Sequence, residues 1–157
     1  GAFGENLTTS GIEVNEALIG ERWKIGSVIL EVAEPRIPCR VFAGLWDIPT
    51  LIKDFTNSRR SGAYLRIIQE GSIQVGDKIE IVSRPKHDVS IKDVFAAKSG
   101  ERGKITELKN VKRLLKTLYP LDIKYADDLP PYGKIATKFA NPIKIKRNIL
   151  LIKLVIF

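Results

Sequence analysis

Residues 28–32, Val-Ile-Leu-Glu-Val, are the most strand-like stretch of the chain, because almost all of them are apolar and most are β-branched. We expect this strand to end at Pro35, which has no backbone N–H to donate. Residues 64–68 and 78–82 have the same character, and turns are expected at Gly71 and Gly76. Short strands separated by glycine turns predict a mainly β fold, a barrel or a sandwich, rather than a parallel α/β sheet.

Outward from these strands, residues 5–8 form a short strand candidate. A helix is expected to start at residues 47–49, with Pro49 in its first turn and Leu51 and Phe55 on one face.

The sequence pattern changes near residue 86. The spacing Ser90-x-x-Asp93 resembles a capping box and predicts a helix start. Apolar residues recur at helical spacing over 108–118, after a capping Thr106. Residues 143–157 fit a strand or a helix, and their weak alternation favours a strand. We therefore expect a β-barrel portion over 1–85 and a basic, helical C-terminal appendage with a terminal strand over 86–157.

Composition excludes several classes of protein. Of the 157 residues, 44% are hydrophobic and 28% are charged, so the chain can bury a core. One cysteine excludes an intramolecular disulfide scaffold, and one histidine excludes a zinc finger or a multi-histidine metal site. The longest apolar run is too short to span a bilayer, so we expect no membrane contact and a cytoplasmic location.

The net charge of +8 belongs to the end of the chain, because residues 99–157 hold 13 Lys and Arg against 5 Asp and Glu. Such a tail can bind nucleic acid. The aromatic residues in it are scattered, however, and lysine-rich solvated helix faces explain the charge more simply.

The candidate chemistry lies in residues 34–40, Glu-Pro-Arg-Ile-Pro-Cys-Arg. Prolines at 35 and 38 stiffen the approach to Cys39, and Arg36 and Arg40 on either side would favour a thiolate and attract an anion. Such a thiolate could be a nucleophile, a sulfur carrier or a ligand of a soft metal. The structural alternative is that Cys39 is a small buried core residue.

Three motifs carry a family resemblance: Phe-Gly-Glu-Asn-Leu-Thr-Thr at 3–9, Ile-Gly-Glu-Arg-Trp-Lys-Ile-Gly at 19–26 and Glu-Val-Ala-Glu-Pro-Arg-Ile-Pro-Cys at 31–39. In this order and spacing, they resemble the MOSC domain. That domain is found at the C-terminus of eukaryotic molybdenum cofactor sulfurases and also as stand-alone bacterial proteins. The resemblance covers residues 1–84.

The resemblance implies a distorted β-barrel that binds the molybdenum cofactor (molybdopterin). Cys39 would be the catalytic residue and the metal ligand, or would carry sulfur. Four arginines would contact the anionic groups of the cofactor, and two polar residues of the first motif would shape its pocket: Arg36, Arg40, Arg60, Arg66, Asn6 and Thr8. The similar bacterial branch reduces N-hydroxylated bases and amidoximes.

Two of these arginines have simpler interpretations. Arg60 belongs to a basic pair in a predicted loop, where a solvated role is common. Arg66 alternates with Leu65 and Ile67, so it could be only the polar face of a strand.

Partners follow from what the sequence lacks. It has no dinucleotide fingerprint, flavin motif or iron–sulfur cysteine cluster, so reduction would need an external electron-donor protein, and sulfur transfer a sulfur donor. Pyridoxal phosphate, which is sometimes attached to descriptions of the family, belongs to a separate desulfurase domain of the full sulfurases.

The chain departs from the family before residue 3, where a Gly-Asp motif and a His-Gly-Gly motif are expected and absent. A chain without them would lack the opening barrel strands. Residues 143–157 could fill that gap, or two chains could close each other as a homodimer. The alternative function is a non-catalytic anion-binding, cofactor-binding or assembly module.

Overall fold

The computed structural model describes residues 4–100, 143–145 and 152–156. Its main element is a six-stranded sheet with the order β1-β8-β4-β3-β2-β6. The strands are β1 (Leu7–Thr9), β2 (Arg22–Ile25), β3 (Val28–Pro35), β4 (Ala63–Gln69), β6 (Ile79–Ser83) and β8 (Ile152–Ile156). A second sheet pairs β5 (Gly71–Ile73) with β7 (Ile143–Ile145). The predicted mainly β fold is thus confirmed.

The predicted barrel is corrected by this topology. Within the described residues, β1 pairs only with β8 and β6 pairs only with β2. A closed barrel has no edges, whereas this sheet has one at each end. The sheet is therefore open.

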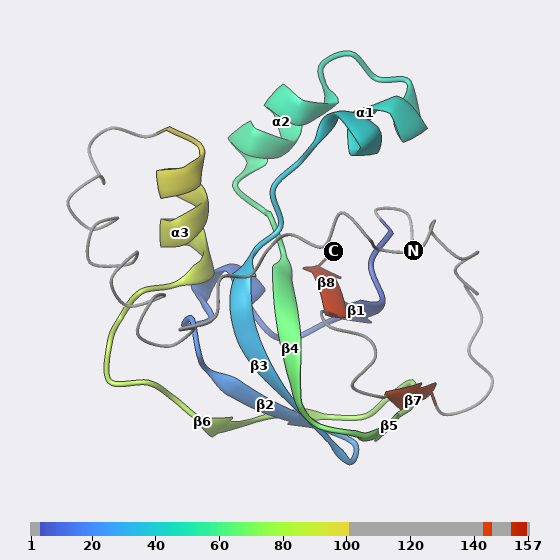
Figure 1. Cartoon of the computed structure of the whole chain (residues 1–157), viewed down its shortest axis with the longest axis vertical. Coiled ribbons are helices and arrows are strands. Elements are labelled where there is room, and N and C mark those ends of the chain that lie inside the picture. The colour runs from blue at the N-terminus through green and yellow to red at the C-terminus, as the bar shows by residue number, and fades with distance from the viewer. Residues whose placement is uncertain (1–3, 101–142, 146–151, 157) are drawn as a thin grey trace.

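The end of the chain contributes strands, as its alternation predicted. β8 lies between β1 and β4, parallel to β1 and antiparallel to β4 (Figure 1). Of the two alternatives for closing the sheet, a strand from residues 143–157 is the one that the structure contains, although its place between β1 and β4 was not predicted. The helix predicted over 108–118 lies outside the described residues.

The main core lies on β2, β3 and β4. Alternate residues of β2 and β4 point inward, whereas most residues of β3 are buried. Trp23, Leu30 and Leu65 are fully buried there. The helix α3 (Ile91–Lys98) and the short 3-10 helix η1 (Val14–Glu16) pack against this core and against each other. The capping box predicted for α3 is present, with the Ser90 hydroxyl and the Asp93 carboxylate each bonded to the other's backbone N–H.

Two further helices stand beyond the ends of β3 and β4 (Figure 1). They are α1 (Arg40–Trp46) and α2 (Leu51–Ser58), joined by a short turn. The helix expected to start at residues 47–49 is α2, but it begins at Leu51 after the N-cap Thr50, so Pro49 precedes its first turn instead of lying in it. Four elements were not predicted: η1, β2, α1, which directly follows Cys39, and β5, which begins at Gly71 where a turn was expected.

A second apolar cluster joins this helical hairpin to the rest of the molecule. It consists of Phe42 from α1, Phe55 from α2 and Phe95 from α3, with Leu51 at its border. The Phe42 and Phe55 rings meet edge to face, with centroids 5.5 Å apart. The cluster therefore fixes the position of α1, and with it the position of Cys39.

Candidate functional site

Cys39 occupies the junction between the sheet and the helical hairpin. The chain leaves β3 at Pro35 and runs through residues 36–39 to α1. The backbone N–H of Arg36 donates to the carbonyl of Gly62 on the returning segment, at 3.4 Å. Cys39 is the N-cap of α1 in an extended conformation, and its carbonyl accepts from the Ala43 N–H at 3.0 Å.

The Cys39 thiol is exposed and free. The interpretation of this cysteine as a buried core residue is therefore wrong. An exposed thiol can be reached by a ligand, a metal or a sulfur donor.

Arg36 lies under the hairpin with only 8% of its surface exposed. Its guanidinium carbon is 4.4 Å from the ring centroid of Phe42 and 5.9 Å from that of Phe55. These are cation–π contacts. The buried Nη1 atom of Arg36 has no hydrogen-bond partner within the described structure.

An unpartnered cationic donor is costly in an apolar environment, because it has lost its hydration without replacing it. The aromatic faces offset part of this cost but accept no conventional hydrogen bond. The donor that remains is suited to an anionic oxygen. Arg36 thus has a buried Nη1 donor without an acceptor, three residues before an exposed thiol.

The other predicted anion contacts differ in their surroundings. Arg40 and Arg60 are exposed, the first at the start of α1 and the second on the segment that returns from α2. Arg66 lies instead on β4, directly opposite Glu31 of β3. Its Nη1 lies 3.6 Å from the Glu31 carboxylate, which also binds Arg22 at 2.9 Å. This agrees with the polar-face interpretation of Arg66.

Asn6 and Thr8 lie in or next to β1, the edge strand of the sheet farthest from β6. Two strands, β8 and β4, separate β1 from β3, which leads to Cys39. The Thr8 hydroxyl donates to the buried carboxylate of Glu5 at 3.1 Å. Burial would raise the pKa of Glu5, but the hydrogen bonds that its carboxylate accepts, this one among them, leave that pKa below the ordinary value. The described contacts of Thr8 are therefore local to the first motif, and its place in a cofactor pocket stays a prediction.

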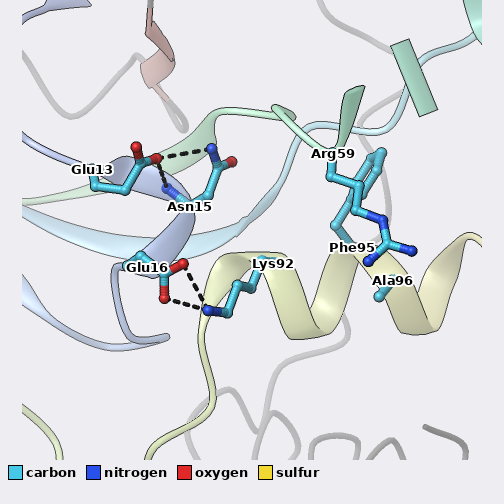
Figure 2. Close-up of a pocket in the computed structure, with 7 residues that line it drawn as sticks. All are labelled: Glu13, Asn15, Glu16, Arg59, Lys92, Phe95 and Ala96. Atoms are coloured by element: carbon cyan, nitrogen blue, oxygen red, sulfur yellow. Dashed lines mark hydrogen bonds and ion pairs between the residues drawn. The ribbon is translucent and has the colours of Figure 1, made fainter. Parts of the chain in front are cut away.

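A separate pocket of about 410 Å³ opens between η1, α3 and the end of α2 (Figure 2). Its charged residues are Glu13, Glu16, Arg59 and Lys92, and the Glu16 carboxylate binds the Lys92 ammonium. No predicted site residue lines it. Phe95 forms part of its wall and belongs to the cluster on which Arg36 stacks, so the pocket adjoins the hairpin without including Cys39.

Sequence reasoning missed the aromatic partners of Arg36 and the carboxylate partner of Arg66. The positions of Phe42 and Phe55 in the sequence did not indicate that both rings would contact Arg36, because those contacts depend on how α2 packs against α1. Among the described residues, no group of three or more His, Cys, Asp or Glu could hold a metal ion. Nor does any helix in that part of the chain have the length and hydropathy needed to cross a membrane.

Comparison with known proteins identifies the family of this chain. The family model described as "MOSC domain" matches residues 1–80. A protein named "Reductase" from Gibberella moniliformis is 36% identical over 95 residues, which are 60% of this chain and 17% of that protein. "Protein YiiM" from Escherichia coli is 30% identical over 95 residues, or 60% of this chain and 42% of the relative. The chain thus spans less than half the length of these two relatives.

The fold has a solved counterpart. The crystal structure of YiiM from Geobacillus stearothermophilus matches with a TM-score of 0.63 and 26% identity, over 74% of this chain and 65% of that one.

Proposed function

The chain belongs to the MOSC domain family, and we propose that it binds the molybdenum cofactor and takes part in the reduction of N-hydroxylated compounds, with Cys39 as the metal ligand. The observation that carries the proposal is the arrangement of residues 36–39. A buried guanidinium with an unpartnered Nη1 and an exposed thiol lie on one short segment between β3 and α1.

The residues present fit the chemistry of that cofactor. A thiolate is a soft ligand of the kind that binds molybdenum, and Cys39 is accessible. Arg36 offers a donor for a phosphate or an oxyanion, and the exposed Arg40 and Arg60 add positive charge at the start of α1 and after the end of α2. When bound, the cofactor would supply a metal that accepts and passes on electrons.

Each residue has a defined task under this proposal. Cys39 would hold the metal, and Arg36 would bind and orient an anionic group while its ring contacts with Phe42 and Phe55 keep it in place. Reduction of an N-hydroxy compound breaks the N–O bond and consumes two electrons and two protons, giving the amine and water. Because the thiol is exposed, solvent water can deliver both protons.

A direct assay tests the reductase proposal. The protein, expressed with molybdate, is supplied with benzamidoxime and with reduced methyl viologen as a small electron donor, and formation of benzamidine is measured. We expect turnover by the wild type and a loss of turnover in Cys39→Ser. Arg22→Met is the control, because Arg22 lies on β2 and Glu31 keeps Arg66 as a partner when Arg22 is removed. Equal turnover in wild type and Cys39→Ser would remove Cys39 from the mechanism.

The exposure of Cys39 also favours a second function, sulfur transfer, because a carrier thiol must be reached by both a donor and an acceptor. This alternative predicts a persulfide on Cys39 after incubation with a sulfane-sulfur donor such as thiosulfate, whose outer sulfur passes to the thiolate while sulfite leaves. The product is detected as the mass of one added sulfur atom. A folded wild-type protein with neither molybdenum nor a persulfide would instead support a non-catalytic module.

A further inference from the structure

The pocket between η1, α3 and the end of α2 has the size of a small-molecule site (Figure 2). Its volume of about 410 Å³ lies in the range that such sites have in proteins. Phe95 and Ala96 of α3 form its apolar wall, and both are buried. Because Phe95 also belongs to the cluster with Phe42 and Phe55, the packing of the helical hairpin fixes the position of this wall.

Two oxygen atoms on the η1 side of the pocket have no hydrogen-bond donor among the described residues. The Oε1 atom of Glu13 accepts from the backbone N–H of Asn15 at 3.3 Å and from its Nδ2 at 3.0 Å, whereas Oε2 accepts from neither. Because Nδ2 donates to the carboxylate, the amide oxygen Oδ1 of Asn15 points away from Glu13, as Figure 2 shows. This Oδ1 atom is buried and has no partner in the described structure.

These two oxygen atoms indicate what kind of group would bind beside them. A buried acceptor without a partner is costly, and a carboxylate oxygen forms its strongest hydrogen bonds with a cationic donor. A primary ammonium group has three N–H donors and the charge opposite to that of Glu13. The η1 side of the pocket therefore favours a protonated amine.

The remaining charges of the pocket favour a second, anionic group on the same ligand. The Lys92 ammonium contacts both carboxylate oxygens of Glu16, at 2.6 and 2.5 Å, so these two charges compensate each other. Arg59 adds a cation from the end of α2. The lining thus holds two carboxylates and two cations, and its net charge is zero. A ligand with one ammonium and one carboxylate group is complementary to such a lining.

The backbone of Arg59 supports a role for its side chain. Arg59 is the C-cap of α2 in the left-handed conformation, with a φ of +55°. Glycine and asparagine favour this conformation, whereas an L residue with a long side chain adopts it at a cost. A strained residue that lines a pocket points to a function of its side chain there.

We propose that this pocket binds a free aromatic amino acid. The ammonium group of the ligand would bind Glu13 and Asn15, and its carboxylate would bind Arg59. Its ring would lie against the apolar wall, where Phe95 offers an aromatic contact. The proposal does not depend on the proposed reductase function, because none of the predicted site residues lines this pocket.

Calorimetric titration with L-phenylalanine tests the proposal. Two analogues separate the charged groups, because 2-phenylethylamine lacks the carboxylate and 3-phenylpropionate lacks the ammonium. The pocket variants are Glu13→Gln and Arg59→Met. Glu13→Gln removes the charge but keeps an oxygen that accepts the bonds from Asn15, so the fold should persist. The matched control is Glu80→Gln, which makes the same change at an exposed residue of β6 outside the pocket.

We expect saturable binding of L-phenylalanine to the wild type. Each analogue, and each pocket variant with L-phenylalanine, should bind about tenfold more weakly or worse, because each loses one charge-assisted contact. Glu80→Gln and Cys39→Ser should bind L-phenylalanine as the wild type does. Because the titration needs neither turnover nor cofactor, its result is independent of the reductase assay.

Three results would overturn the proposal. The first is that L-phenylalanine does not bind saturably to the folded wild type. The second is equal affinity of wild type and Glu13→Gln for L-phenylalanine. The third is that 2-phenylethylamine binds as tightly as L-phenylalanine, because the pocket would then recognise an amine alone.

Discussion

Arg36→Met separates a structural role of the buried arginine from a role in ligand binding. The variant removes the unpartnered Nη1 and keeps an unbranched apolar chain that can cover the Phe42 ring. If Arg36 mainly stabilises the helical hairpin, its replacement should lower the free energy of unfolding. If its role is to bind an anion, the replacement should weaken ligand binding far more than it lowers stability.

The contacts of Arg36 give the expected magnitudes. Stacking of a desolvated guanidinium on an aromatic face, here at 4.4 Å from the Phe42 centroid, stabilises the folded state by about 2 kcal/mol. A buried donor without a partner costs about 1–3 kcal/mol. The two contributions oppose each other, so we expect the free energy of unfolding of Arg36→Met to stay within about 1 kcal/mol of wild type. A charge-assisted hydrogen bond to an anion is worth about 1.5–3 kcal/mol, so pterin affinity should fall by about 10- to 100-fold.

Urea unfolding followed by tryptophan fluorescence measures the first quantity, and pterin fluorescence of the purified protein measures the second. Arg22→Met is the control, because Arg22 is half exposed and its ion pair with Glu31 should contribute less than about 1 kcal/mol. A loss of more than about 2 kcal/mol in Arg36→Met, with unchanged pterin content, would show that the arginine is structural.

The remaining predictions concern the fold and are read from urea or thermal unfolding. Ser90→Ala removes the cap of α3 and should cost about 1 kcal/mol, whereas an unchanged midpoint would mean that the capping box contributes nothing. Trp23→Phe removes the 2.6 Å hydrogen bond from the indole N–H to buried Glu21 and should cost about 2–4 kcal/mol. Gly26→Ala should cost about 2 kcal/mol or more, because Gly26 has a φ of +57° and its added Cβ would collide with a neighbouring carbonyl. Gly44→Ala, inside α1 with open space around it, should instead stabilise by about 0.5–1 kcal/mol, and a loss of stability there would contradict the exposed position of that helix.

The elements that sequence alone predicts are those whose signals are local. The β-branched run at 28–32 lies in β3, and the Ser90-x-x-Asp93 spacing gives the cap of α3, because both depend on residues within a few positions of each other. The helix α1 escaped prediction because its apolar residues do not lie on one side. Phe42 faces the cluster while Val41 and Leu45 face solvent, so the amphipathic pattern is missing.

The parts that sequence reasoning could not supply depend on distant contacts. The pairing of Arg66 with Glu31 needs the register between β3 and β4. The insertion of β8 between β1 and β4 joins the two ends of the chain, and no local pattern encodes it. The sequence motif around Cys39 identified residues 34–40 as a candidate site. It could not show that Nη1 of Arg36 lacks a hydrogen-bond partner, because this depends on the packing of α1 and α2 over Arg36.

Metal and pterin analysis of the protein expressed with molybdate, with wild type beside Cys39→Ser, tests the central claim most directly. The account predicts stoichiometric molybdenum and pterin in the wild type and a marked loss of molybdenum in Cys39→Ser, because a hydroxyl is a poor substitute for a thiolate ligand. Equal molybdenum in both proteins would remove Cys39 from the metal site. A folded wild type that contains neither molybdenum nor pterin would contradict the account as a whole.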